Sequence, residues 1–295
     1  MHASNDSERP LTPGAAPGDR YRLLDCGDGR KLEQCGSVMV DRPAPQAMGA
    51  PRLPRNVWST ADGRFVSTPG GDGAWSWRTE DPQSWTVEWP GCRLLARSGT
   101  GGQVGLFPEQ EANWKWVRDR CRVAQGDLSV LNLFAYTGAM TLQAAGTGAR
   151  VCHVDGARGH VQWAQENASL NGLAGAPIRW ITDDAPGFVR REIRRGRHYD
   201  GIVLDPPSFG RGPGGEVFEI KNDLAGLVDA CLELLSDAPS FVVLSAHTPG
   251  WGSTALAECL APLVGGFGGS VSSVDMKIEG EGIELASGAC ARWAP

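Results

Sequence analysis

The 295-residue sequence lacks any apolar run that could cross a lipid bilayer, for which about 20 consecutive apolar residues are needed. Apolar stretches such as Ile202–Leu204 and Phe241–Ala246 are far shorter. The first 20 residues also lack the apolar core of a secretory signal peptide. These absences predict a cytoplasmic protein without membrane contacts.

Paired cysteines are absent as well. None of the eight cysteines forms a CxxC pair, and no two lie close to a histidine at metal-ligand spacing. Most fall in apolar stretches, where a free thiol behaves as a small buried hydrophobic group. The sequence therefore predicts no metal site and no disulfide framework. The cysteines are Cys26, Cys35, Cys92, Cys121, Cys152, Cys231, Cys259 and Cys290.

The chain lacks the positive charge of proteins that hold nucleic acid by bulk electrostatics, since its net charge is −6. Residues 21–125 carry 14 Lys and Arg against 12 Asp and Glu, whereas residues 126–295 carry 12 against 19. A nucleic-acid substrate would need local contacts. The densest basic run has two interpretations, a solvated helix surface or an RNA phosphate track. It consists of Arg190, Arg191, Arg194, Arg195 and Arg197.

Composition divides the chain into four parts. Residues 1–20, rich in Pro, Gly and Ser, are predicted to form a disordered leader. Residues 21–105 show short apolar segments cut by turn dipeptides, which predicts a small β-rich domain. Residues 106–125 predict a linking helix, and residues 126–295 the main domain. Strands are expected at Ser37–Val40, Trp85–Trp89 and Arg93–Arg97, and the linking helix at Glu109–Cys121.

Seven of the eleven tryptophans lie between Trp58 and Trp116. They are typical of a hydrophobic core, and this is the favoured interpretation. A surface on which single-stranded bases stack is the alternative, because exposed aromatic rings hold unpaired bases.

Residues 126–295 alternate between apolar strands and helices, which predicts an α/β, Rossmann-like parallel sheet with helices on both faces. Ligands of such sheets bind at the carboxyl ends of the strands. The strands are expected at Val130–Phe134, Val151–Val154, Ile178–Thr182, Ile202–Leu204 and Phe241–Ser245. The helices are expected at Thr137–Gly146, Arg158–Leu170, Ala185–Arg195 and Glu219–Leu235.

Three strand ends carry candidate cofactor residues. The first strand continues into Tyr136-Thr137-Gly138, a turn whose backbone suits a carboxylate or phosphate but lacks the GxGxxG glycines of dinucleotide sites. Asp155 can accept the ribose hydroxyls of a nucleoside cofactor, or it can cap the helix that follows. Asp183 and Asp184 have two equal interpretations, contact with an adenine amine and capping of a helix.

The fourth strand ends in the sequence DGIVLDPPSFG (200–210). Asp205 and the carbonyl of Pro206 can present hydrogen-bond acceptors to a planar nitrogenous substrate. The two prolines stiffen the loop, and Phe209 can stack on the substrate ring. A rigid surface turn is the alternative interpretation.

Residues from about 103 to 250 resemble the bacterial ribosomal-RNA large-subunit methyltransferases, a group that includes enzymes making 5-methylcytosine in 23S rRNA. The matching segments are GLFPEQEANW, NLFAYTGAMTLQAA, VDGARGHVQWAQENASLNGL, TDDAPGFV and VLDPPSF. The resemblance implies a class I methyltransferase sheet, S-adenosylmethionine as methyl donor and ribosomal RNA as substrate. The family carries an aromatic-Asp-Gln loop over the cofactor where this chain has Glu109 and Gln110.

The implied cofactor contacts follow the strand ends. Phe134 to Gly138 would bind the amino-acid end, Asp155 the ribose, and Asp184 with Ala185 the adenine. The full predicted set is Gln110, Asn132, Phe134, Ala135, Tyr136, Thr137, Gly138, Asp155, Gly156, Ala157, Asp183, Asp184, Ala185 and Asp205.

The sequence departs from its 5-methylcytosine-forming relatives at the fifth strand. Methylation of carbon 5 needs a cysteine nucleophile, yet this strand ends in LSAHTPGW (244–251), which has His247 and no cysteine. This predicts direct transfer to nitrogen or oxygen, with Asp205 or His247 as proton acceptor. His247 has a surface-loop residue as its alternative interpretation. The predicted catalytic residues are Asp205, Pro206, Phe209 and His247.

Two other functions stay open at this point. A methyltransferase for a small molecule or a protein suits the acidic charge. A non-catalytic nucleotide-binding Rossmann module, or a nicotinamide enzyme, suits the fold class but is weakened by the missing GxGxxG. The sequence carries no indication of the oligomeric state.

Overall fold

The computed structural model describes residues 19–68, 73–124 and 128–295, so the first 18 residues of the predicted leader lie outside the described residues. No helix in these three ranges combines the length and apolar character needed to cross a membrane. Within the same ranges, no group of three or more His, Cys, Asp or Glu side chains is arranged to hold a metal ion.

Five parallel strands form one end of the main sheet, in the order β10-β9-β8-β11-β14 with β10 at the edge. The two strands β11 and β14 are almost entirely apolar and fully buried, as expected for strands covered on both faces, whereas the edge strand β10 is partly exposed. All five predicted strands are confirmed to within two residues. They are β8 (Ser129–Leu133), β9 (Arg150–Asp155), β10 (Ile178–Thr182), β11 (Gly201–Leu204) and β14 (Phe241–Ala246).

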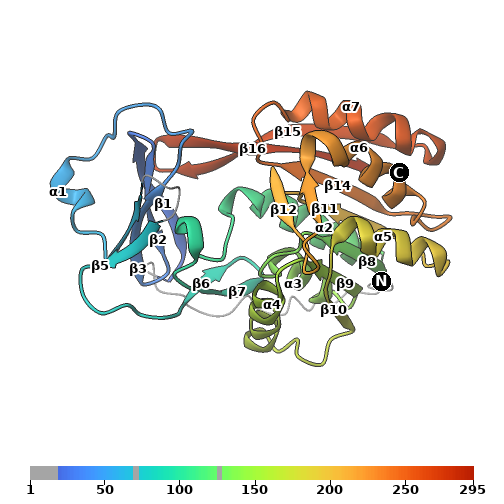
Figure 1. Cartoon of the computed structure of the whole chain (residues 1–295), viewed down its shortest axis with the longest axis horizontal. Coiled ribbons are helices and arrows are strands. Elements are labelled where there is room, and N and C mark those ends of the chain that lie inside the picture. The colour runs from blue at the N-terminus through green and yellow to red at the C-terminus, as the bar shows by residue number, and fades with distance from the viewer. Residues whose placement is uncertain (1–18, 69–72, 125–127) are drawn as a thin grey trace, which may run out of the picture.

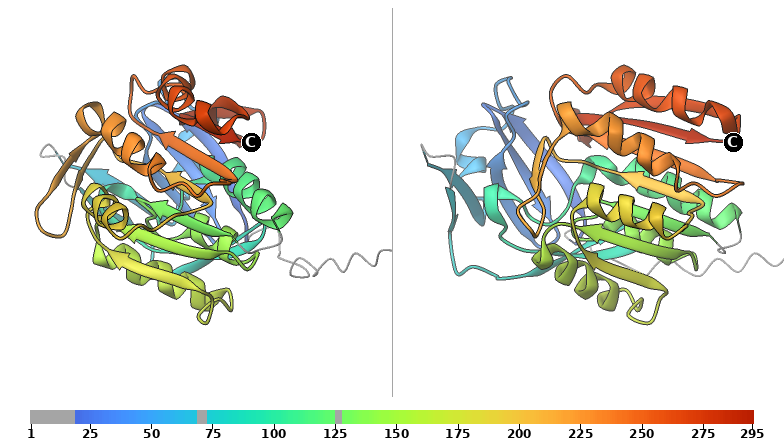
Figure 2. Two further views of the ribbon diagram at one scale, coloured as in Figure 1. Left: turned by 90° about the vertical axis from the view of Figure 1, so that its right-hand side faces the viewer. Right: turned by 45° about the vertical axis from the view of Figure 1, so that its right-hand side comes forward.

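Helices cover both faces of these strands (Figure 2). One layer consists of α2 (Glu111–Val123), α3 (Ala139–Ala145) and α4 (Arg158–Leu170). The other consists of α5 (Ala185–Arg194), α6 (Ile220–Leu232) and α7 (Ser253–Val264). Five of the six were predicted, and α7 was not. The remaining helical turns are α1 (Arg55–Trp58), η1 (Thr100–Gly102), η2 (Pro108–Gln110) and η3 (Gly265–Phe267).

A long antiparallel hairpin joins the main sheet to the N-terminal strands (Figure 1). It consists of β15 (Ser270–Gly280) and β16 (Ile283–Ala294), and β16 pairs with β14. Near the tip, Gly280 pairs with Leu23 of β1, so that twelve strands form one continuous sheet. The N-terminal strands of this sheet are β1 (Tyr21–Gly27), β2 (Arg30–Cys35), β3 (Val38–Pro43), β4 (Gly63–Ser67) and β5 (Gly73–Trp77).

Two short hairpins complete the fold. The first, β6 (Trp85–Trp89) with β7 (Cys92–Ala96), packs on α4, where Asn167 and Asn171 accept hydrogen bonds from the Leu95 and Arg93 amides at 2.7 Å each. The second, β12 (Phe209–Arg211) with β13 (Val217–Glu219), follows the DPPS segment. Both predicted strands of the first hairpin are confirmed to within one residue.

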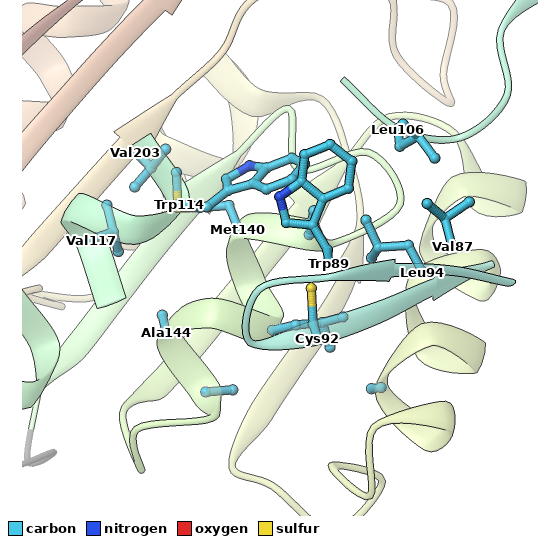
Figure 3. Close-up of a cluster of buried hydrophobic side chains, with 14 of the residues drawn as sticks. Val87, Trp89, Cys92, Leu94, Leu106, Trp114, Val117, Met140, Ala144 and Val203 are labelled. Carbon is cyan, nitrogen blue, oxygen red and sulfur yellow. The ribbon is translucent and has the colours of Figure 1, made fainter. Parts of the chain in front are cut away.

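The tryptophan-rich region contributes to a core shared by the N-terminal strands and the main sheet (Figure 3). Trp85, Trp89 and Trp114 are 4–8% exposed, and the Trp89 and Trp114 rings pack edge to face at 5.4 Å. Trp114 comes from α2, and Met140 from α3 packs in the same cluster. The core interpretation is therefore confirmed for these three tryptophans. Because this cluster crosses residue 105, the division into two domains there stays a prediction.

The arginine run lies along α5 and the turn after it. Helix α5 begins beside the carboxyl ends of the strands and runs back for ten residues, about 15 Å, toward their amino ends. Arg191 forms an ion pair with Asp183, and Arg195 contacts Glu192 at 3.0 Å. Arg194 and Arg197 are exposed. The run is thus partly neutralised, and its C-terminal end lies at the sheet edge opposite the ligand-binding edge.

Candidate active site

A cavity of about 530 Å³ opens at the carboxyl ends of the parallel strands. Its size suits a nucleoside-sized ligand, and its position matches the ligand site of open α/β sheets. Every sequence-predicted site residue lines it. These are Gln110, Asn132, Phe134, Ala135, Tyr136, Thr137, Gly138, Asp155, Gly156, Ala157, Asp183, Asp184, Ala185, Asp205, Pro206, Phe209 and His247.

The turn after β8 brings backbone close to this cavity. Phe134 and Tyr136 have positive φ values of 56° and 49°, and Gly138 has 86°. A non-glycine residue pays strain energy in this region, so two such residues in three positions mark a backbone held by its surroundings. A Cβ on Gly138 would lie 2.9 Å from the Ala164 Cβ, which explains the glycine. Thr137 anchors the turn by donating to the Gly105 carbonyl at 2.6 Å.

Asp155 connects the first two strand ends. Its Oδ2 accepts from the Tyr136 amide at 2.8 Å, and its Oδ1 accepts from the Ala157 amide at 2.9 Å and lies 3.1 Å from His160 Nδ1. Burial would raise the pKa of this carboxyl, but the hydrogen bonds from His160 and the two amides outweigh burial and lower it. The N-cap residue of α4 is Ala157 and the helix has no side-chain cap, so Asp155 bonds the amide of the N-cap residue without being the cap itself. The ribose role stays a prediction.

The acidic pair after β10 has two different structural roles. Asp184 is the N-cap of α5 and accepts from the Gly187 amide at 2.8 Å. Asp183 accepts from the Asp184 amide at 2.9 Å and forms the ion pair with Arg191. The capping alternative is thus confirmed for Asp184, while the adenine contact stays a prediction for both.

Asp205 lies at the other end of the cavity, in a network of polar side chains. Its Oδ2 accepts from the Gln110 amide at 2.9 Å, and its Oδ1 accepts from the Ser245 hydroxyl at 2.7 Å. Gln110 also donates to Ser245 at 3.0 Å and accepts from Asn113 at 2.5 Å. Gln110, which the resemblance placed over the cofactor, therefore contacts the acidic group of the DPPSF segment.

His247 completes this network. Its Nε2 lies 3.4 Å from Asp205 Oδ1, and its Nδ1 lies 3.0 Å from the Ser287 carbonyl and 3.5 Å from Glu109 Oε1. Burial would lower the pKa of His247, but the negative charges of Asp205 and Glu109 outweigh it and raise the pKa to about 9. His247 is therefore protonated near neutral pH. An imidazolium can only donate a proton, which favours Asp205 as the proton acceptor, and the catalytic role of His247 stays a prediction.

Phe209 lies on a strand rather than in a rigid loop, which corrects the loop interpretation. It pairs with Glu219 in the β12–β13 hairpin, and it is 51% exposed at the rim of the cavity. The opposite face of this hairpin carries Phe218, which is 3% exposed and packs on Phe134 at 5.1 Å between ring centroids. Phe218 thus forms the inner wall, and Phe209 faces outward.

None of the eight cysteines, all in the described part of the chain, lines the cavity, and all eight are free thiols. Cys290 of β16 is connected to the site through one residue, because its Sγ lies 3.1 Å from Asn113 Oδ1 and Asn113 contacts Gln110. Cys290 is fully buried, and burial raises the pKa of its thiol to about 11. Neither Cys231 nor Cys259, the two cysteines that follow the DPPSF segment most closely, reaches the cavity.

Sequence reasoning missed several residues of the site. His160, Ser245, Phe107 and Phe218 line the cavity. Two of them could have been found from the sequence. His160 lies in the first turn of the helix predicted after Asp155, and Ser245 ends a predicted strand two residues before His247. The backbone carbonyl of Ser287 could not have been found, because it reaches His247 from the unpredicted hairpin.

Comparison with known proteins agrees with this geometry. The family model for S-adenosylmethionine-dependent methyltransferases matches residues 51–259. A ribosomal RNA large subunit methyltransferase K/L from Hahella chejuensis is 34% identical over 161 residues, which cover 54% of this chain and 21% of that protein. The corresponding protein of Syntrophotalea carbinolica is 38% identical over 110 residues, covering 37% and 15%. The chain thus spans about a fifth or less of the length of these relatives.

Solved structures extend the likeness to nearly the whole chain. A SAM-dependent methyltransferase from Agrobacterium tumefaciens is 39% identical, with a TM-score of 0.89, and the match covers 96% of this chain and 92% of that one. A Streptococcus mutans structure, 18% identical with a TM-score of 0.74, covers 95% of this chain and 76% of that one, and shares the fold. The family match makes S-adenosylmethionine the cofactor and removes the nicotinamide and non-catalytic alternatives. The chain belongs to the S-adenosylmethionine-dependent methyltransferases.

Proposed function

We propose that this methyltransferase acts on RNA, in the first place ribosomal RNA, and transfers the methyl group directly, without a cysteine adduct. The observation that carries the substrate is the 34% identity over 161 residues to a ribosomal RNA large subunit methyltransferase. The observation that carries the direct transfer is a cavity without any cysteine in its lining.

The cofactor end of the cavity fits S-adenosylmethionine. The turn from Phe134 to Gly138 presents backbone for the amino-acid end of the cofactor. Asp155 accepts from three donors, which leaves about one lone-pair site of its carboxylate for a ribose hydroxyl. Its neighbour His160 has a 41% exposed side chain and can move aside to free a second site. Asp183, Asp184 and Ala185 lie at the part of the cavity assigned to the adenine.

The bound cofactor supplies a methyl group already activated by a positive sulfonium. The protein therefore has to orient an acceptor atom for in-line attack and keep its lone pair available, which is catalysis by positioning. Asp205 is suited to this task, because three donors occupy its oxygens and leave about one lone-pair site for a substrate N–H or O–H. Pro206, which is buried, fixes the backbone beside it.

The outer rim of the cavity can receive a planar base. Phe209 exposes half of its surface there, and the Arg211 guanidinium lies 5.6 Å from the ring centroid. An exposed aromatic ring beside an arginine is the pairing that single-stranded nucleic acids use for stacking and phosphate contact. An unpaired nucleotide is therefore the substrate form that this rim suits.

A transfer assay tests the proposal. Ribosomal RNA is purified from cells of the source organism in which the gene is deleted, because RNA from intact cells would already carry the methyl group. We expect radioactive methyl from S-adenosylmethionine to appear in this RNA with the wild-type protein and not with Asp205→Asn, which keeps the size of the side chain. Label confined to the protein or small-molecule fraction would contradict an RNA substrate.

A small molecule or a protein is the second candidate substrate, favoured by the net charge of −6. Phosphate-rich RNA is repelled by such a charge unless basic groups gather locally. The same assay decides between the two, because the fractions are separated before counting.

A further inference from the structure

The segment just before α2 places the carboxylate of Glu109 and the side-chain amide of Gln110 beside the acceptor end of the cavity. Gln110 bonds Asp205, and its neighbour Glu109 faces His247. Phe107 of the same segment packs on the His247 ring, with 5.6 Å between the centroids. Gln110 thus contacts the carboxylate, and Phe107 and Glu109 contact the histidine, of the Asp205–His247 pair.

Glu109 is an unusual carboxylate. Its side chain is only 6% exposed, and its Oε2 atom is buried without a hydrogen-bond partner among the described residues. A buried carboxylate without full hydrogen bonding is costly, and it persists where charged neighbours or function compensate. Burial raises the pKa of Glu109, while the positive charges of Lys31, His247 and Arg42 oppose that rise.

The order of atoms forms a chain from Glu109 to the acceptor. Glu109 Oε1 lies 3.5 Å from His247 Nδ1, and His247 Nε2 lies 3.4 Å from Asp205 Oδ1. The Ser287 carbonyl, 3.0 Å from Nδ1, fixes the plane of the ring. A cation between two carboxylates stabilises the ionised form of both, and a ring held at both nitrogens cannot rotate.

We infer that Glu109 is a positioning residue of the methyl transfer: by keeping His247 protonated, it preserves the contact that orients Asp205 toward the acceptor atom of the substrate. The inference rests on the proposed function only in assigning Asp205 to the acceptor. During transfer the new bond joins the acceptor nitrogen or oxygen to the methyl carbon, and the old S–C bond breaks with its electron pair going to sulfur. The proton leaving the acceptor is taken by Asp205, whose orientation depends on the contact with protonated His247.

The pKa of His247 depends on the groups that face it from each neighbouring element. They are Asp205 after β11, Glu109 in η2, Gln110 beside it, the Phe107 ring and the Ser287 carbonyl of β16. Only Glu109 and Asp205 among them carry charge. Removing the Glu109 charge should therefore lower the pKa of His247, and the protonated, active form should be lost at a lower pH.

The direct test is an NMR titration of His247 in protein without cofactor. The chain has five histidines, so the His247 signal is assigned by its loss in His247→Asn. In the wild type we expect titration near the pKa of about 9. In Glu109→Gln we expect a fall of about one to two units, the size of an opposite charge lost at this distance. Glu109→Asp, which keeps the charge on a shorter side chain, should give a smaller fall.

Glu111→Gln is the matched control. It removes the same charge two residues away, where the electrostatic neighbours are Arg118, Glu279 and Lys115 instead of His247, and the His247 titration should not move. Identical titration of His247 in the wild type and Glu109→Gln overturns the inference. Should Glu109→Gln fail to fold, an unshifted titration in Glu109→Asp overturns it equally.

Activity gives a second readout. Turnover should fall as pH rises through the pKa of His247, and this alkaline limb should move to lower pH in Glu109→Gln with the KM for S-adenosylmethionine unchanged. If RNA proves not to be the substrate, the titration still decides the role of Glu109. If His247 titrates identically in the wild type and in Glu109→Gln while RNA is methylated, only the role of Glu109 is overturned.

Discussion

The two ends of the cavity are built by different means. At the cofactor end, backbone does most of the work: positive φ values at Phe134, Tyr136 and Gly138 turn the chain, and Asp155 ties the amides of two turns together. At the acceptor end, the site is formed mainly by side chains, in a charged cluster of Asp205, His247 and their neighbours. The first arrangement recognises a fixed shape, and the second adjusts charge on a reacting group.

The contrast also concerns distance along the chain. Asp155 is 19 residues from Tyr136, to which it is bonded. Gln110 is 95 residues from Asp205 and 135 from Ser245. The cofactor end is therefore set within two consecutive β-α-β units, from β8 to β10, whereas the acceptor end also depends on η2, β14 and β16. Mutations at the two ends should separate cofactor binding from chemistry.

The largest expected effect is at the acceptor end. Asp205→Ala should lower turnover about 10²- to 10⁴-fold, the range for loss of a positioned acid–base group, because no other carboxylate replaces it. Affinity for S-adenosylhomocysteine, measured by calorimetry, should stay at the wild-type value. Equal losses of turnover and cofactor affinity would break the proposed division of the cavity.

The next largest effect is at the cofactor end. Asp155→Ala should weaken S-adenosylmethionine binding by about one to three kcal/mol, the range for a lost partner of buried polar groups. The Tyr136 and Ala157 amides lose their acceptor as well, so the turn itself should loosen. Calorimetry measures the change, with NAD as the control ligand that the wild type should not bind. Tight NAD binding, with no binding of S-adenosylmethionine or S-adenosylhomocysteine, would contradict the assignment of this end of the cavity to S-adenosylmethionine.

The difference between local and distant contacts also explains which parts of the fold and site could be predicted from the sequence. The strand ends carrying Asp155, Asp184 and Asp205 were found, because apolar runs locate parallel strands and their carboxyl ends must converge. The β15–β16 hairpin was not found, because most of β15 is exposed and only Met276 and Ile278 of its residues are buried, so that it shows no clear alternation.

Side-chain contacts between distant segments were equally hidden. The family resemblance pointed to Gln110 as a cofactor residue, and sequence proximity gave no reason to pair it with Asp205. The charge state of His247 depends on Glu109 and on the Ser287 carbonyl, which approach from two other elements. A motif identifies which residues reach a site, but only the packed sheet decides which of them touch.

A smaller effect is expected far from both ends. Replacing Arg194 and Arg197 with Ala should lower RNA affinity only a few-fold and reduce the slope of affinity against salt by about two, if both contact phosphates. Cofactor affinity should not change, since these residues lie at the opposite edge of the sheet. Filter binding over a range of salt measures the slope, with Arg191→Ala as a control that removes a paired arginine. An unchanged slope returns the run to a solvated surface.

The smallest expected effect is a null result that tests the acceptor end most strictly. RNA containing 5-fluorocytosine traps enzymes that methylate carbon 5, because their cysteine adds to carbon 6 and fluorine blocks the proton loss that releases it. Here we expect no covalent protein–RNA band under denaturing conditions. The lining of the cavity has no thiol, and Cys290 is fully buried with a pKa raised to about 11, so that almost no thiolate forms near neutral pH.

Cys290→Ser is the variant that gives this null result its force. The serine hydroxyl can keep a hydrogen bond to Asn113, so the Asn113–Gln110–Asp205 contacts should persist and methyl transfer should stay near the wild-type rate. A stable adduct that forms with wild-type protein and disappears in Cys290→Ser would show that the hairpin strand β16 opens to deliver a nucleophile. That outcome would overturn direct transfer. It would also mean that the side-chain cluster at the acceptor end rearranges during the reaction, whereas the proposed direct transfer requires Asp205 and His247 to stay as the structure places them.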